Sequence, residues 1–222
     1  VGIFSMIERP SLYMVTRPEI RAMAELKGKT IGLGSIGGIT VTITRRMLAS
    51  YGVSANDFTI VSSGDLPVRL AAVKSGAIHA TLAGPPAPVQ AKELGLNVLA
   101  SAADTVDFPL AGLSTATAKI RTNRAEVVAV LTAMLRGLQF VRGQRSEAVS
   151  LIQKVFRMER ELAEAGYDQT LPAYSKDGTA SARGIESVLE VARQGGGAKA
   201  VGVNDVVDFT PLREAQAAVK LR

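Results

Sequence analysis

Short apolar runs alternate with helix-like patterns along the first half of the chain. The runs predict strands, because each is bounded by glycine or polar residues and too short for a buried helix. They cover residues 30–33, 58–61, 78–83 and 97–100. Apolar residues at helical spacing lie between the runs. Strands that alternate with helices are typical of βαβ units and a parallel sheet.

The helices between these strands have recognisable start and stop signals. A first helix is predicted over residues 41–51, with Gly52 after its end. Asp65 is expected to cap a second helix, with Pro67 in its first turn and Gly76 at its end. A third helix is expected to begin after Gly84-Pro85-Pro86 and to stop at Gly95.

The second half of the chain is predicted to be mainly helical. Apolar residues from Val127 to Val141 follow one helical face, and Asn123 and Glu126 have the spacing of a capping box. Ser146 is expected to cap the next helix. In that helix the residues expected to face inward are Val149, Ile152, Val155 and Phe156. A short helix is expected over residues 159–165, stopped by Gly166, and another around 185–192, ending at glycines 195–197. A short element is expected to start at Asp205, and Pro211 is expected to head a terminal helix.

Composition narrows the possible chemistry. The chain has 222 residues, 47% of them hydrophobic, so it forms one large domain or two small lobes. It has no cysteine, which excludes disulfides, zinc–thiolate sites and cysteine nucleophiles. Its single histidine, His79, lies at the start of a predicted strand and is expected to be structural or partly exposed. No apolar run approaches the ~18–20 residues of a membrane span, and residues 1–8 lack the basic region of a signal peptide.

Net charge is +6, and basic residues concentrate between residues 119 and 145. Such a run is most often the solvated face of a helix. A nucleic-acid site would interleave basic with aromatic residues, whereas aromatic residues make up 5% of the chain and none cluster there. Nucleic acid is therefore not an expected partner.

Residues 32–37 read Gly-Leu-Gly-Ser-Ile-Gly, between a predicted strand and a predicted helix. This is the context of the dinucleotide fingerprint, which also requires an acidic residue at the end of the next strand. That strand ends instead in Ser62-Ser63-Gly64, and Asp57 lies at its start. An NAD(P)-binding α/β enzyme that uses Gly32–Gly37 therefore stays an alternative.

The same turn suits an anion without any nucleotide. Gly37 and Gly38 permit close backbone approach, and the helix start offers free N–H groups and the positive end of a dipole. Ser35 and Thr40 add hydroxyls. A sulfonate, nitrate, carboxylate or phosphate would fit such a site, while an ordinary tight turn is the simpler interpretation.

Several segments resemble one known family. The run Glu25–Gly38 (ELKGKTIGLGSIGG) resembles the L-K-G-K-x-I-G segment of type II periplasmic solute-binding proteins of ABC importers, especially the nitrate, sulfonate, taurine and thiamine-pyrimidine-precursor group. The resemblance covers nearly all of the chain. Other segments that carry it are Arg9–Tyr13, Arg17–Ile20, Gly52-Val53 with Asn56-Asp57, Leu70–Ile78, Gly84–Pro86 and residues 124–155.

The resemblance implies an α/β fold of two lobes, with mixed, mainly parallel sheets flanked by helices. Residues 27–108 would form the second lobe, and residues 1–26 and 109–222 the first. Family members have a strand–helix–strand–helix segment before the position at which this chain begins, so the first lobe is expected to be incomplete. Exposed apolar surface, an open half-cleft or self-association through that lobe would follow.

The resemblance also implies a receptor with no catalytic residues, no cofactor and no metal. It would capture a small anionic ligand between the lobes and deliver it to a membrane permease, in the periplasm or exported and tethered to the membrane. Where the family usually has Asp, this chain has His79. The effector-sensing domain of a transcription regulator shares the two-lobed fold and is another alternative. The residues expected at the ligand are Ser35, Gly37, Gly38, Thr40, Gly64, Asp65, Gly84 and Pro85, with Phe108 as an apolar wall.

Overall fold

The computed structural model describes residues 1–194 and 201–220. The chain divides into two compact units, each assembled from separate stretches of sequence. The first unit comprises Val1–Arg9, Asp107–Arg157 and Leu171–Arg222, and the second comprises Pro10–Val106 and Met158–Thr170. Each is described by itself.

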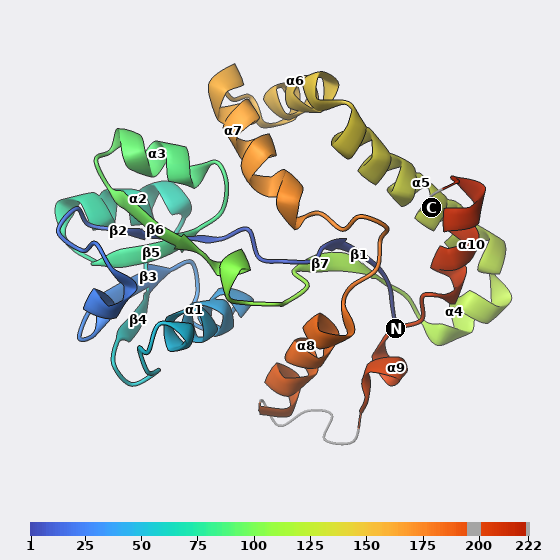
Figure 1. Ribbon diagram of the computed structural model, residues 1–222, viewed down its shortest axis with the longest axis horizontal. Coiled ribbons are helices and arrows are strands. Elements are labelled where there is room, and N and C mark those ends of the chain that lie inside the picture. The colour runs from blue at the N-terminus through green and yellow to red at the C-terminus, as the bar shows by residue number, and fades with distance from the viewer. Residues whose placement is uncertain (195–200, 221–222) are drawn as a thin grey trace. The chain divides into compact units, whose positions relative to one another are not determined.

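The second unit is built on a five-stranded sheet with the order β4-β3-β5-β2-β6 (Figure 1). Strand β3 runs parallel to β4 and β5, whereas β2 is antiparallel to β5 and β6. The sheet is therefore mixed, with a parallel centre at β4-β3-β5. Its strands are β2 (Tyr13–Thr16), β3 (Thr30–Leu33), β4 (Thr59–Ser62), β5 (Ala80–Ala83) and β6 (Asn97–Ser101).

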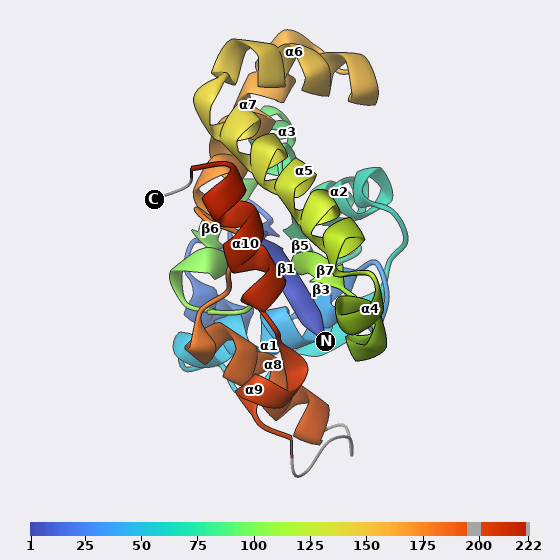
Figure 2. The ribbon, with the colours of Figure 1, turned by 90° about the vertical axis from the view of Figure 1, so that its right-hand side faces the viewer.

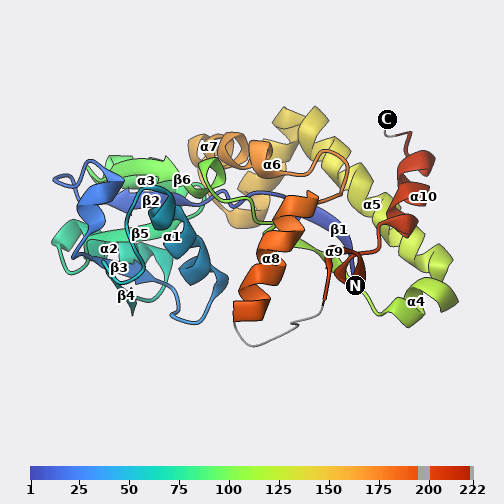
Figure 3. The ribbon, with the colours of Figure 1, turned by 60° about the horizontal axis from the view of Figure 1, so that its bottom comes forward.

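Helices cover both faces of this sheet. Helices α2 and α3 share one apolar cluster with the sheet, and α1 lies on the other face (Figures 1 and 3). Every residue of β5 is buried, as expected for a strand covered on both faces. The unit's helices are η1 (Met23–Leu26), α1 (Ile39–Ser50), α2 (Leu66–Ser75), α3 (Ala87–Glu93), η2 (Ala102–Asp104) and α7 (Arg160–Thr170).

The predicted strands and helices of this region are confirmed to within about two residues. Asp65 occupies the predicted cap position, but its side chain does not cap the helix. Asp65 occupies the N-cap of α2, and its backbone oxygen accepts from Arg69 N at 3.0 Å, while its carboxylate makes no capping hydrogen bond. Gly76 ends α2 in the left-handed region at φ 86°, as its position predicts.

The compact units divide the chain differently from the predicted lobes. Residues 10–26 were expected with the first lobe, yet they lie in the second unit, because β2 is hydrogen-bonded between β5 and β6. The stretch 158–170 also belongs to that unit, where Ser11 Oγ donates to Gln169 O at 2.9 Å. Predicting that residues 10–26 belong to the second unit would have required knowing which strands pair with β2.

The first unit is built around the antiparallel pair β1 (Gly2–Ile7) and β7 (Ala111–Ser114), with α5 and α10 alongside (Figure 2). Its apolar cluster joins Ile3 and Phe4 of β1 to Leu131 and Leu135 of α5 and to Leu212 of α10. Strand β1 was not among the predicted strands. The helices are α4 (Thr117–Thr122), α5 (Arg124–Gly143), α6 (Arg145–Phe156), η3 (Leu171–Ala173), α8 (Ala182–Gln194), α9 (Val203–Val206) and α10 (Thr210–Ala218).

Two capping predictions in this unit are wrong. Asn123 precedes α5, but its Oδ1 accepts from Thr122 Oγ1 at 2.7 Å, and Glu126 pairs with Lys119 at 2.7 Å, so no capping box forms. Ser146 lies inside α6, which begins one residue earlier, and its backbone oxygen accepts from Ser150 Oγ. Competing side-chain partners explain the first error.

Burial and helix length differ from prediction near the end of α6. Val155 and Phe156 were expected to face inward, yet they are 62% and 67% exposed. Gly166 was expected to stop a helix but lies within α7, where its oxygen accepts from Thr170 Oγ1. The predicted helix end at glycines 195–197 lies outside the described residues.

The close approach of β7 to β1 predicts opposite effects for two glycine substitutions. A Cβ at Gly112 would collide with Phe4 O and lie 3.3 Å from Ser5 Cα, so Gly112→Ala should lower the free energy of unfolding by about 1–3 kcal/mol. A Cβ at Gly137 in α5 would meet no heavy atom of the described residues within 4 Å apart from the nearby backbone of its own helix, so Gly137→Ala should raise this free energy by about 0.5–1 kcal/mol. Urea unfolding measures both, and equal effects would contradict the β1–β7 geometry.

Candidate functional site

The loops that follow β3, β4 and β5 lie at one edge of the second unit's sheet. These strands are parallel and adjacent, so their carboxyl ends meet there. The loops are Gly34–Gly38, Ser63–Asp65 and Gly84–Pro86. Ser62 Oγ, at the end of β4, donates to Gly34 O at 3.4 Å and so links that strand end to the first loop. Open α/β sheets place ligands at such an edge.

The start of α1 lies at this edge and has unused hydrogen-bond donors. Gly38 is the N-cap residue with an extended backbone (φ −92°, ψ 169°), and no side chain in the described part of the chain caps the helix. Ser35 and Gly37 are exposed, and Thr40 is half-buried. A Cβ at Gly38 would lie 2.9 Å from Ser35 Oγ, so glycine allows this hydroxyl close to the helix start. Free N–H groups and the helix dipole favour an anion here.

Arg69 adds a guanidinium that the sequence pattern did not single out. It lies on α2, and its Nη1 donates to Thr81 Oγ1 at 3.0 Å and to Leu82 O at 2.9 Å on β5. Its Nε is buried and has no partner among the described residues. Partial burial lowers the pKa of Arg69, and the nearby Asp65 carboxylate raises it. The available signal was a basic residue four positions after the predicted cap, one turn into the helix.

Exposed apolar side chains accompany the polar groups of this edge. Ile36 is 67% exposed within the Gly34–Gly38 loop, and Val68 is 59% exposed in the first turns of α2. Val68 Cγ1 lies 3.8 Å from a Cβ placed on Gly64, so it flanks the second loop. Ile39 at the start of α1 is also exposed. The edge therefore offers apolar surface beside its anion-attracting groups.

The first glycine of the dinucleotide-like motif has a packing role. Gly32 is buried inside β3 rather than in the turn, and a Cβ there would collide with Ile78 and lie 2.7 Å from Ser63 Oγ. Thr81 Oγ1 donates to Gly32 O at 2.8 Å. Asp57 lies at the opposite end of β4, where it accepts from Ser54 N at 2.8 Å. Close packing therefore explains why residue 32 is glycine. The acidic residue that the dinucleotide fingerprint requires directly after the second strand is not present after β4.

The remaining predicted residues lie in different surroundings. Gly84 and Pro85 are half-buried after β5, and a Cβ on Gly84 would lie 3.5 Å from Leu12. Phe108 belongs to the first unit and is 4% exposed, so its role as an apolar wall of the ligand site stays a prediction.

His79 is held by two hydrogen bonds to the backbone of Thr30 in β3. Its imidazole Nδ1 accepts from Thr30 N at 3.2 Å, and its backbone N–H donates to Thr30 O at 2.9 Å. Partial burial lowers the pKa of His79 below its usual value, Arg17 and Lys29 lower it further, and Glu19 opposes them. Its Nδ1 is thus used in structure, as expected for a lone histidine at a strand start.

Two broader features concern residues 1–194 and 201–220 as a whole. No helix there combines the length and apolar character needed to cross a bilayer. Within the same residues, no three His, Cys, Asp or Glu side chains gather closely enough to hold a metal ion.

Comparison with known proteins gives a family and a fold. Residues 1–148 match the family model described as NMT1/THI5 like. No curated protein matches the chain.

Three solved structures illustrate the fold. A putative sulfonate ABC transporter component from Methylobacillus flagellatus KT, the periplasmic sulfonate-binding protein SsuA, is 18% identical over 99% of this chain and 70% of its own, with a TM-score of 0.78. The periplasmic nitrate-binding protein NrtA from Synechocystis PCC 6803 is 15% identical over 99% and 68%, with a TM-score of 0.70. The desulfurization enzyme DSZB is 13% identical over 99% and 79%, with a TM-score of 0.61. The chain thus has the type II periplasmic-binding-protein fold, which binding proteins and an enzyme share.

The lowered pKa of His79 predicts a pH dependence of stability. The unfolded chain takes up the proton near the usual pKa of about 6.5, whereas the folded chain takes it up at lower pH. This contribution to stability is therefore complete above about pH 6.5 and is lost as the pH falls toward the folded pKa.

His79→Gln keeps an acceptor for Thr30 N but removes the titration. Between pH 7.5 and pH 5, the free energy of unfolding measured with urea should fall less for the variant than for the unsubstituted protein. Equal decreases would contradict the lowered pKa of His79.

Proposed function

We propose a function from the premise that this chain belongs to the NMT1/THI5-like family. The chain captures a small organic anion at the carboxyl edge of β3, β4 and β5. It acts as a solute-binding receptor of an ABC-type importer and performs no chemistry on its ligand. The observation that carries this proposal is the convergence of three glycine-containing loops with an uncapped helix start and the Arg69 guanidinium.

Electrostatics supports an anionic ligand. The N–H groups at the start of α1 and the hydroxyls of Ser35 and Thr40 can donate to its oxygens. Arg69 is fixed to β5 through Nη1, its Nε is enclosed by the protein, and the proposed contact with the ligand is made by Nη2. Hydrogen bonds from a charged donor contribute about 1.5–3 kcal/mol each, more than neutral ones. Gly64, Asp65, Gly84 and Pro85 belong to the neighbouring loops and complete the proposed site.

The apolar surface at this edge favours an alkanesulfonate or a taurine-like molecule over nitrate. Ile36, Ile39 and Val68 are exposed beside the proposed anion subsite and can cover the carbon chain of such a ligand. Nitrate has no apolar part and would leave these side chains in water. Burial of each methylene stabilises a complex by up to about 0.8 kcal/mol.

The proposed partner is the membrane permease of an importer, and the proposed location is the periplasm or the outer face of a membrane. The names of the sulfonate-binding and nitrate-binding proteins of the same fold support this assignment. An NAD(P)-dependent enzyme is not favoured, because Gly32 is a packing residue inside β3 and no acidic residue follows β4 directly.

A ligand panel tests the proposal. Isothermal titration calorimetry with butanesulfonate, methanesulfonate, taurine, nitrate, a pyrimidine and NADH should show the tightest binding for butanesulfonate. Affinity should rise about twofold per methylene, because the apolar rim remains partly hydrated. Binding of NADH with no binding of any anion would contradict the proposal.

Substitution of Arg69 tests the site itself. Arg69→Gln should weaken butanesulfonate binding about tenfold or more, because a charged donor is replaced by a neutral one. Arg45, which is exposed on α1, supplies the matched control Arg45→Gln with the same loss of charge. Circular dichroism melts confirm that both variants fold. Equal effects of the two substitutions on affinity would mean that only net charge matters and would exclude Arg69 as a ligand contact.

A further inference from the structure

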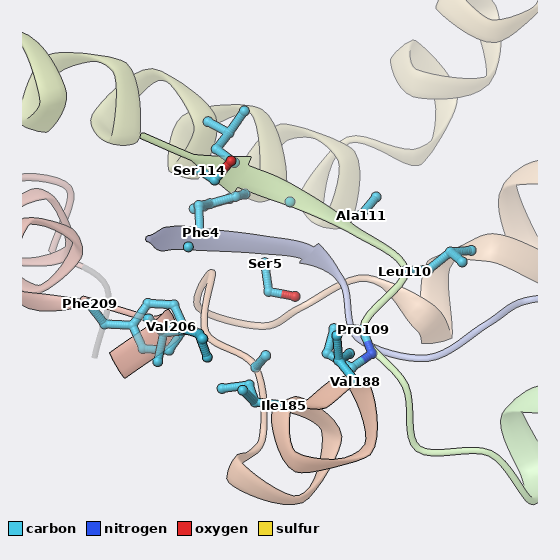
Figure 4. Close-up of a pocket in the computed structure, with 15 residues that line it drawn as sticks. Phe4, Ser5, Pro109, Leu110, Ala111, Ser114, Ile185, Val188, Val206 and Phe209 are labelled. Carbon is cyan, nitrogen blue, oxygen red and sulfur yellow. The ribbon is translucent and has the colours of Figure 1, made fainter. Parts of the chain in front are cut away.

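The first unit contains a pocket of about 300 Å³ on one face of the β1–β7 pair (Figure 4). Helix α8 supplies Ile185 and Val188 to its wall, Val206 belongs to α9, and Phe209 directly precedes α10. The remaining lining comes from β1, the stretch from Pro109 to Ser114, Ala180 and Val207. All of these residues belong to the first unit, so the pocket shares no residue with the sheet edge of the second unit.

The lining of this pocket has no charged side chain. It is made of aliphatic and aromatic residues, glycines and proline, with the hydroxyls of Ser5 and Ser114 as its polar side chains. An anion would therefore find no compensating charge there, and moving an ion into such surroundings is costly. The pocket is chemically unlike the proposed anion site.

The side-chain hydroxyl of Ser5 is the one buried polar side-chain group in the lining of this pocket, and it lacks a hydrogen-bond partner among the described residues. Its side chain extends from β1 toward the space bounded by Pro109, Ile185 and Val206 (Figure 4). The residue is 5% exposed, and its Oγ has no hydrogen-bond partner among the described residues. Buried hydroxyls are almost always hydrogen-bonded, because an unmade bond is unfavourable. An unpartnered hydroxyl beside a pocket indicates a missing partner.

We propose that this pocket binds a small uncharged molecule with an aromatic or aliphatic body and one hydroxyl or carbonyl group. The body packs against Ile185, Val188 and Phe209, and its polar group exchanges a hydrogen bond with Ser5 Oγ. The volume is at the lower end of ligand pockets and twice that of a cavity that holds benzene, so a two-ring compound fits. This site is independent of the anion site in the second unit.

Two probes that differ by one hydroxyl test this assignment. 2-Naphthol and naphthalene have the same two-ring body, but only 2-naphthol can hydrogen-bond to Ser5. Titration of the chain, followed by ligand fluorescence, should show saturable binding of both, with 2-naphthol bound about three- to tenfold more tightly, the range expected for one hydrogen bond.

Substitutions then separate the hydroxyl from the cavity. Ser5→Ala should reduce 2-naphthol affinity about three- to tenfold, leave naphthalene unchanged and raise the melting temperature, because an unpartnered hydroxyl is removed. Ser150→Ala, at an exposed position of α6, is the control and should alter neither affinity. Ala180→Leu should fill the pocket and abolish binding of both probes.

Several results would overturn the proposal. One is the absence of saturable binding of either probe. A second is equal affinity for the two probes, and a third is a 2-naphthol affinity unaffected by Ser5→Ala. Because Ser5→Ala removes an unfavourable group, its folding does not confound the test, and it decides the matter even where Ala180→Leu fails to fold.

Discussion

The parallel register of β3 with β4 and β5 is the constraint on which the candidate site depends. It places the loops after three strands at one edge, although residues 34–38, 63–65 and 84–86 are far apart in sequence. Burial of Gly32 against Ile78 and Ser63, together with the hydrogen bond from Thr81 to Gly32 O, fixes this register. Arg69 then joins α2 to β5 through the same Thr81. The packing of the sheet therefore positions both the loops of the candidate site and Arg69.

Much of the second unit was predictable from local sequence, because its strands are short apolar runs bounded by glycines. The site loops followed from the rule that parallel strands share a carboxyl edge. What sequence could not supply was contact over long separations. The position of β2 between β5 and β6 depends on pairing, and the role of Arg69 depends on its approach to Thr81 and Leu82. The exposed Val155 and Phe156 show the same limit, since periodicity identifies an apolar face without showing what covers it.

The two units present opposite chemistry. The sheet edge of the second unit combines helix N–H groups, hydroxyls and a guanidinium with exposed aliphatic side chains, which suits a charged head on a short carbon chain. The pocket of the first unit has an uncharged lining around the unpartnered Ser5. Fold alone does not distinguish a receptor from an enzyme, because DSZB shares this architecture with the sulfonate-binding and nitrate-binding proteins. The chemistry of the two sites, and not the fold, therefore separates the possible functions.

Amide chemical-shift mapping with butanesulfonate tests the central claim most directly. In ¹H–¹⁵N spectra of the chain, the largest saturable shifts should fall on Gly37, Gly38, Thr40 and Gly64, whose amides lie at the carboxyl edge of β3 and β4. Saturable shifts confined to β1, β7 and α8, or no saturable shift at any described residue, would contradict the account.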